Sequence, residues 1–143
     1  MRSGADFAST ALLGKIYYDL LAAREERKAD QIAIVRLEQI YPFAQSMVSD
    51  VLLRYPLTAE IIWTQEEPRN MGAWRFLREQ IQPLLDDSGR EVRYVGRTES
   101  ASPATGSHKR HLQEQAEILD EALTIGAVAR KGKVRLVPKR KAK

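Results

Sequence analysis

The chain has 143 residues, a length that suits one domain, and its 43% hydrophobic and 29% charged residues are typical of a globular protein. It contains no cysteine, which excludes disulfides, thiolate metal ligands and thiol nucleophiles and fits a reducing intracellular compartment. No apolar run approaches the roughly 20 residues that a membrane-spanning helix needs, and no secretory signal opens the sequence, so we expect no membrane partner.

The basic character of the chain is concentrated at its C-terminal end. Residues 127–143 hold eight of the 23 lysines and arginines and none of the 19 acids, so the remainder has 15 bases, 19 acids and a net charge of −4, against +4 for the whole chain. We therefore expect an acidic folded body followed by a basic, flexible tail. Binding of nucleic acid or another polyanion through this tail is the lesser alternative.

Strand and helix patterns alternate along the chain. Short β-branched or apolar runs predict buried strands, and apolar residues at spacings of three and four predict helices. Helices should cover both faces of the sheet, because each connection between parallel strands needs a crossover. The expected strands lie at 10–13, 32–35, 61–63 and 92–95, and the expected helices at 16–28, 42–55, 74–85 and 108–123.

The sequence also predicts which helix positions face the core. In the second helix we expect an inner face of Met47, Val51 with Leu52, and Tyr55, with Pro42 at the start and Pro56 at the end. Pro83 should stop or kink the third helix, because it has no amide hydrogen for the helical ladder. Ser107 is the expected N-cap of the last helix. The inner face of that helix is expected at Leu112, Ala116, Leu119 and Leu123.

This pattern predicts an α/β fold with a three-layer, mostly parallel sheet and helices on both faces. The predicted organisation is a start at residues 1–9, one domain at 10–126 and the tail at 127–143. The tail offers one weak candidate for a further edge strand, at 134–137.

Residues 65–74, with the sequence QEEPRNMGAW, carry a carboxylate pair, a proline, a glycine and a tryptophan between a strand and a helix. Glu66 and Glu67 are adjacent, so on a strand they point to opposite faces and cannot share a proton as a catalytic pair would. We expect them to make structural or interface contacts, for example with Arg97. Trp74 should pack in the core or in a subunit interface, and Asn70 is also assigned to the interface.

Several polar residues should converge at the carboxyl ends of the strands. Gly14-Lys15 lies between a strand and a helix, where free amides favour an anion. Salt bridges across a domain interface are the favoured explanation of such a cluster, and an effector site is the alternative. The candidate effector-binding residues are Lys15, Arg36, Gln39, Glu66 and Arg97.

The start of the last helix is basic. His108 and His111 share a helical face, but the sequence supplies no third ligand, so we expect no metal site. Lys109 and Arg110 lie near the positive helix end, which is unfavourable unless they meet acidic groups of a partner. His108, Lys109 and Arg110 are therefore candidate interface residues together with Glu67, and plain surface is the alternative.

Four ordered segments carry a resemblance to a known family. The segments are GKIYYDL at 14–20, RLEQIYPF at 36–43, QEEPRNMGAW at 65–74, and YVGR at 94–97 followed by SASPATGSHKRH at 100–111. Through them the chain resembles the C-terminal domain of 2-oxoglutarate dehydrogenase, a thiamine-diphosphate-dependent enzyme, over roughly residues 11–126. One departure is Leu12-Leu13, where the family usually has a cysteine-serine pair.

The resemblance implies a transketolase C-terminal-like fold and a place in an enzyme of the tricarboxylic acid cycle. That enzyme oxidatively decarboxylates 2-oxoglutarate and transfers a succinyl group to a lipoyl carrier, using thiamine diphosphate and magnesium. The chain has no motif for binding this cofactor, so we assign it no catalytic or cofactor-binding residue and expect it to be inactive alone.

The resemblance also implies partners and a location. The partners are the upstream thiamine-binding domains, a second subunit of a homodimer and the dihydrolipoamide succinyltransferase of the complex. Acetyl-CoA or AMP is an implied effector, although Leu13 removes a hydroxyl and predicts weak affinity for acetyl-CoA. The location is the bacterial cytoplasm or the mitochondrial matrix. An independent ligand-binding module that uses the Gly14-Lys15 edge remains a separate hypothesis.

Overall fold

The computed structural model describes residues 8–12 and 14–125. Four parallel strands form one sheet in the order β2-β1-β3-β4. The elements in chain order are β1 (Ala8–Leu12), α1 (Ile16–Glu26), β2 (Ile32–Arg36), α2 (Gln45–Leu52), β3 (Glu60–Pro68), α3 (Trp74–Leu85), the short 3₁₀ helix η1 (Asp86–Ser88), β4 (Val92–Arg97) and α4 (His108–Ala122). The predicted α/β fold with a mostly parallel sheet is confirmed.

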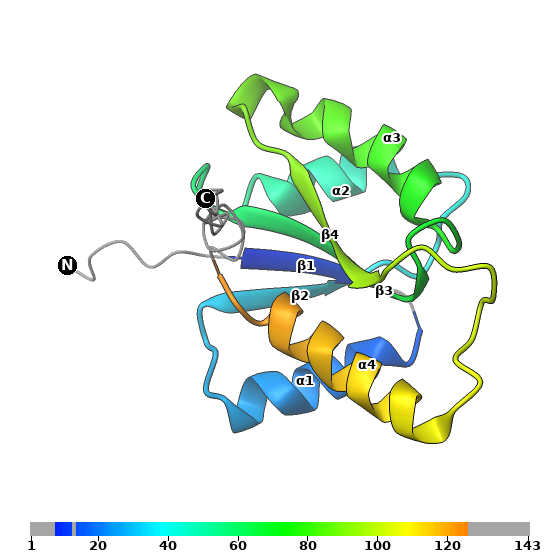
Figure 1. The fold of residues 1–143 in the computed structure, drawn as a ribbon. Helices are drawn as coiled ribbons and strands as arrows, with labels where there is room; N and C mark the ends of the chain where they lie inside the picture. The colour runs from blue at the N-terminus through cyan, green and yellow to red at the C-terminus, as the bar shows by residue number, and fades with distance from the viewer. Residues whose placement is uncertain (1–7, 13, 126–143) are drawn as a thin grey trace, which may run out of the picture.

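The helices lie on opposite sides of the sheet, α1 and α4 on one face and α2 and α3 on the other (Figure 1). Successive residues of β3 supply the two faces in turn: Ile62 packs against α1 and α4, whereas Ile61 and Trp63 pack against α2 and α3. The first face also buries Ile16, Leu20, Ile32, Val95, Ile118 and Ala122, and the second buries Leu52, Trp74, Leu77, Ile81, Leu85 and Val92.

Two predicted inner faces are partly wrong. In α2, Met47 is 68% exposed, because Val48 and Leu52, one helical turn apart, form the side that packs on the sheet. The helix begins at Gln45 rather than at Pro42 and ends at Leu52, before Tyr55. In α4, Leu112 and Ala116 are exposed, and the buried stripe is Ile118 and Ala122 with the following Leu123.

The inward positions of the first half of α4 are polar. Glu114 and Gln115 occupy them, and they bond to other elements rather than fill an apolar core. The hydrophobic pattern therefore misidentified this part of the helix face.

Two end signals also differ from expectation. Pro83 does not stop α3, which continues to Leu85, since a proline in the last turn removes one ladder bond only. Ser107 holds the N-cap position of α4, but its side chain makes no capping bond.

β1 begins at Ala8, ahead of the predicted domain start at residue 10. The predicted tail and its candidate strand at 134–137 lie outside the described residues.

Candidate functional site

The carboxyl end of β3 is organised around one buried amide, the side chain of Gln65, which is 2% exposed. Its oxygen accepts hydrogen bonds from the Trp63 indole at 2.9 Å and from the Trp74 backbone amide at 3.1 Å. Its nitrogen donates to the carbonyl oxygens of Pro68 at 3.2 Å, Met71 at 2.8 Å and, at 3.3 Å, Glu67. Gln65 thus joins the strand, the following turn and the first residue of α3, and it satisfies groups that would be costly to bury alone.

Gly72 is needed in this turn for two reasons. Its φ of +67° lies in the left-handed region, and a Cβ atom at this position would sit 3.0 Å from Nε2 of Gln65. The glycine of the 65–74 motif is therefore explained by the amide that lies beneath it.

Tyr94 ties the ends of β3 and β4 together. Its hydroxyl lies 3.0 Å from the carbonyl oxygen of Glu67 and 2.9 Å from that of Arg97, and it can donate to either. Burial raises the pKa of this phenol to about 12. The guanidinium of Arg69 lies over the rings of Tyr94 and Trp74, at 5.3 and 5.8 Å from their centroids.

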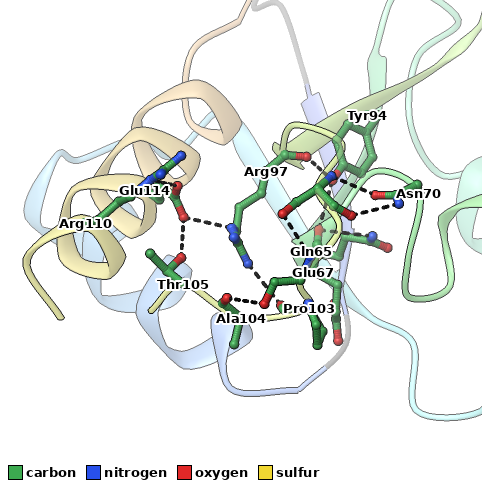
Figure 2. Close-up of polar contacts among 12 residues, drawn as sticks. Gln65, Glu67, Asn70, Tyr94, Arg97, Pro103, Ala104, Thr105, Arg110 and Glu114 are labelled. Carbon is green, nitrogen blue, oxygen red and sulfur yellow. Dashed lines mark hydrogen bonds and ion pairs between the residues drawn. The ribbon is translucent and has the colours of Figure 1, made fainter. Parts of the chain in front are cut away.

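Arg97, at the end of β4, forms an ion pair of 2.7 Å with Glu114 of α4 (Figure 2). The two side chains are 12% and 19% exposed, so water screens this pair less than a surface pair. The pKa of the Glu114 carboxyl lies below its usual range, mainly because Thr105 donates a hydrogen bond to it. The hydrogen bond from Arg110 and the positive charges of Arg97 and Arg110 lower the pKa further, whereas burial opposes them.

The same network holds the loop 98–106, which connects β4 to α4. Asn70 exchanges two hydrogen bonds with the backbone of Ser100, at 3.0 and 3.1 Å. Arg97 donates to the carbonyl oxygen of Pro103 at 3.0 Å, and Thr105 donates to Glu114 at 2.7 Å. Figure 2 shows these contacts converging on one side of the sheet edge. We call this set of residues (Gln65, Asn70, Tyr94, Arg97, Thr105 and Glu114) the strand-end network.

The five candidate effector residues all lie at or near the carboxyl ends of the strands, but their side chains do not share partners. Lys15 pairs with Asp19 at 3.7 Å, and Gln39 donates to the carbonyl oxygen of Pro42 at 3.0 Å. Arg36 lies over the rings of Tyr17 and Tyr18, at 5.2 and 5.6 Å, and 3.6 Å from Glu38. The pairing expected between Arg97 and Glu66 or Glu67 is wrong, because Arg97 pairs with Glu114.

The candidate effector residues also line different cavities at this edge of the sheet. Arg36 and Gln39 line a mostly apolar cavity of about 430 Å³ between the end of β2 and α2. Glu66 and Arg97 line a smaller cavity of about 260 Å³ beside α4, together with Glu67, His111 and Glu114. Lys15 lines neither, so no common cavity among these brings the five residues together.

The candidate interface residues fall into two groups. Trp74 is 5% exposed and packs in the core between α3 and the sheet, beside Tyr94. Glu67, Asn70, His108, Lys109 and Arg110 are exposed, and Arg110 pairs with Glu114 at 3.0 Å.

Within the described residues, no three His, Cys, Asp or Glu side chains are arranged to hold a metal ion. No helix in that part of the chain has the length and apolarity to cross a membrane.

Sequence reasoning missed the centre of the network. Gln65 lies within the 65–74 motif but has no predicted role there, and the predicted site residues do not include Tyr94, Thr105 or Glu114. One signal was available: Gln65 follows directly on the buried run of β3, where a polar side chain must find partners. The polar groups of the strand-end network bond mainly to one another and to nearby backbone, and they thereby fix the shape of the sheet edge.

Comparison with known proteins agrees with the motifs. A family model described as 2-oxoglutarate dehydrogenase C-terminal matches residues 9–123. The 2-oxoglutarate dehydrogenase E1 component of Rickettsia felis is 49% identical over 112 residues, and that of Cupriavidus necator is 45% identical over 109 residues. The mitochondrial 2-oxoglutarate dehydrogenase of Caenorhabditis briggsae is 45% identical over 113 residues.

These matches cover 76–78% of this chain but only 11% of each relative, so the chain spans a small part of the curated relatives' length. The match of the family model, together with these identities, confirms the resemblance drawn from the four ordered segments. The chain belongs to the 2-oxoglutarate dehydrogenase C-terminal domain family.

Proposed function

We propose that this chain serves as the C-terminal domain of a 2-oxoglutarate dehydrogenase E1 component and that its role there is structural. It stabilises the homodimer and supports the domains that hold thiamine diphosphate and magnesium. Oxidative decarboxylation of 2-oxoglutarate and succinyl transfer to the lipoyl carrier of the succinyltransferase take place in the whole enzyme. The names of relatives at 45–49% identity support this assignment.

The observation that carries the structural role is the strand-end network. The loop 98–106 is largely exposed, yet side-chain bonds to Asn70, Arg97 and Glu114 fix it to the turn between β3 and α3, to the end of β4 and to α4. Ordering a loop costs conformational entropy, about 1–2 kcal/mol for each residue fixed. A surface that is ordered in advance loses less entropy when it meets a neighbouring domain.

Two carboxylates are presented beside this ordered edge. The side chains of Glu66 and Glu67 make no ion pair with any residue in the described part of the chain, and both line the cavity of about 260 Å³. We assign them to contacts with basic groups of an adjoining domain. Binding of an effector such as acetyl-CoA or AMP is a separate proposal. It rests on the predicted cluster at the carboxyl edge of the sheet, which consists of Lys15, Arg36 and Gln39 beside β1 and β2, and Glu66 and Arg97 on β3 and β4.

The test is a domain exchange. Residues 9–123 replace the matching segment in the E1 component of Cupriavidus necator, and 2-oxoglutarate-dependent ferricyanide reduction is measured. We expect the chimera to keep most of the parent's activity and the parent's subunit mass, and a deletion of the segment to lose both. A chimera that is soluble and folded but inactive would contradict the proposal.

A further inference from the structure

The exposed side of α3 carries a charge pattern that the fold of one chain does not explain. The buried side of this helix is Trp74, Leu77, Ile81 and Leu85. The opposite stripe lines a groove of about 670 Å³, to which Arg69 and Glu99 also contribute. This α3 stripe consists of Arg75, Arg78, Glu79, Gln82 and Asp86.

The charges of the α3 stripe are separated along the helix. Arg75 lies in the first turn, and Asp86 lies at the C-cap, roughly 16 Å away at about 1.5 Å per residue. The helix has no acid in its first turn and no base in its last. This is the reverse of what the helix dipole favours, so the side-chain charges add to the dipole instead of offsetting it.

Partners within the chain do not compensate these charges. Across the described residues, Arg75, Arg78 and Glu79 form no ion pair or side-chain hydrogen bond, and the side chain of Arg69 contacts only the two aromatic rings. Asp86 accepts one hydrogen bond from Gln82. The groove therefore holds three guanidinium groups and three carboxylates, with no ion pair between the two sets.

We propose that the α3 stripe is the contact surface for the α3 stripe of a second copy of this chain, in antiparallel orientation. A two-fold axis brings the same surface of both copies together, so that surface must complement itself. In the antiparallel arrangement Arg75 of one copy faces Asp86 of the other, Arg78 lies near Glu79 and Gln82, and the two helix dipoles oppose each other. A wholly acidic or wholly basic partner would complement only one half of the stripe.

This inference rests on the proposed role in stabilising a homodimer, and it names the surface. The experiment measures self-association of the full chain by sedimentation equilibrium at low and high salt, for the parent and for two charge reversals, Arg75→Glu/Arg78→Glu and Glu79→Arg/Asp86→Arg. Each reversal alone should weaken association by roughly ten-fold or more, because like charges then meet across the contact. An equimolar mixture of the two variants should restore a mixed dimer.

The control is Lys28→Glu/Arg54→Glu, which makes the same change of net charge as Arg75→Glu/Arg78→Glu but at exposed positions outside the groove. It should leave association unchanged. A chain that stays monomeric at low salt, a mixture that does not associate, or a control that weakens association as much as the reversals would each overturn the inference. An active domain-exchange chimera with a monomeric isolated chain would reject this surface while leaving the proposed function standing.

Discussion

Substitutions at Gly72 and Gly89 distinguish the backbone strain of a positive φ from the steric contact of an added Cβ atom. Both have a positive φ, +67° and +66°, but a Cβ atom at Gly72 meets Gln65, whereas one at Gly89 meets nothing within 4 Å. Gly89→Ala should cost only the backbone term of about 1–2 kcal/mol. Gly72→Ala should cost clearly more in the free energy of unfolding, measured by urea denaturation. Equal costs would show that the buried amide has room to move.

Glu114 gives the fold a defined pH dependence. Its pKa is held low by Thr105, Arg110 and Arg97, so the folded state favours the ionised carboxylate. The stabilisation is present in full above the ordinary glutamate pKa of about 4.3 and is lost as the pH falls through the lower pKa of the folded state. Glu114→Gln should therefore be most destabilising at neutral pH and less so below about pH 4.

Unfolding curves of the parent and Glu114→Gln at pH 7, 5 and 3.5 test this dependence. Glu117→Gln, at an exposed position on the same helix, is the matched control and should cost little at any of these pH values. A destabilisation by Glu114→Gln that did not change with pH would show that the ionised form has no special partner.

At the scale of the element, α3 depends on its first residue. Trp74 is buried against the sheet, its ring lies 5.2 Å from that of Tyr94, and its amide is bonded to Gln65. Trp74→Ala should destabilise the fold by roughly 3–5 kcal/mol, since it removes a large buried side chain and leaves a cavity. A denaturation midpoint equal to that of the parent would show that the indole is not part of the core.

Hydrophobic periodicity located the elements well and their faces less well. The bounds of α3 were predicted at both ends, since its apolar stripe is regular. The buried face of α4 is not predicted correctly, because Glu114 and Gln115 point inward to make polar contacts, which hydrophobic periodicity does not detect. The strand-end network joins residues from 65 to 114, and such pairings depend on the sheet order, which one sequence does not give.

At the scale of the whole molecule, the isolated chain should bind no thiamine diphosphate and should not decarboxylate 2-oxoglutarate. The reason is that the sequence has no motif for the pyrophosphate and magnesium of this cofactor. Calorimetry with thiamine diphosphate and magnesium, and ferricyanide reduction with 2-oxoglutarate, check both expectations. Turnover that stops when thiamine diphosphate is omitted would contradict them.

Affinity for acetyl-CoA should be weak or absent in this chain. The resemblance described above places Leu13 at a position where it implies a serine, and Lys15 and Arg36 already pair with Asp19 and Glu38. If binding occurs at this end of the sheet, Lys15→Ala and rising salt should weaken it, because charged contacts carry much of the affinity for phosphate. Arg97→Ala should weaken it as well if the predicted effector cluster acts as one site. Tight stoichiometric binding that survives Lys15→Ala would contradict this account.

Removing β1 from the molecule would break the sheet on both sides of this strand. β1 is the first strand along the chain, yet it pairs with both β2 and β3 and so takes part in two of the three strand pairings. Cleavage between β1 and α1, followed by removal of β1, would leave β2 without a neighbour in the described sheet. Fragment complementation should succeed at this point, with a synthetic β1 peptide restoring the larger fragment, whereas removal of β4 would leave the other three strands paired.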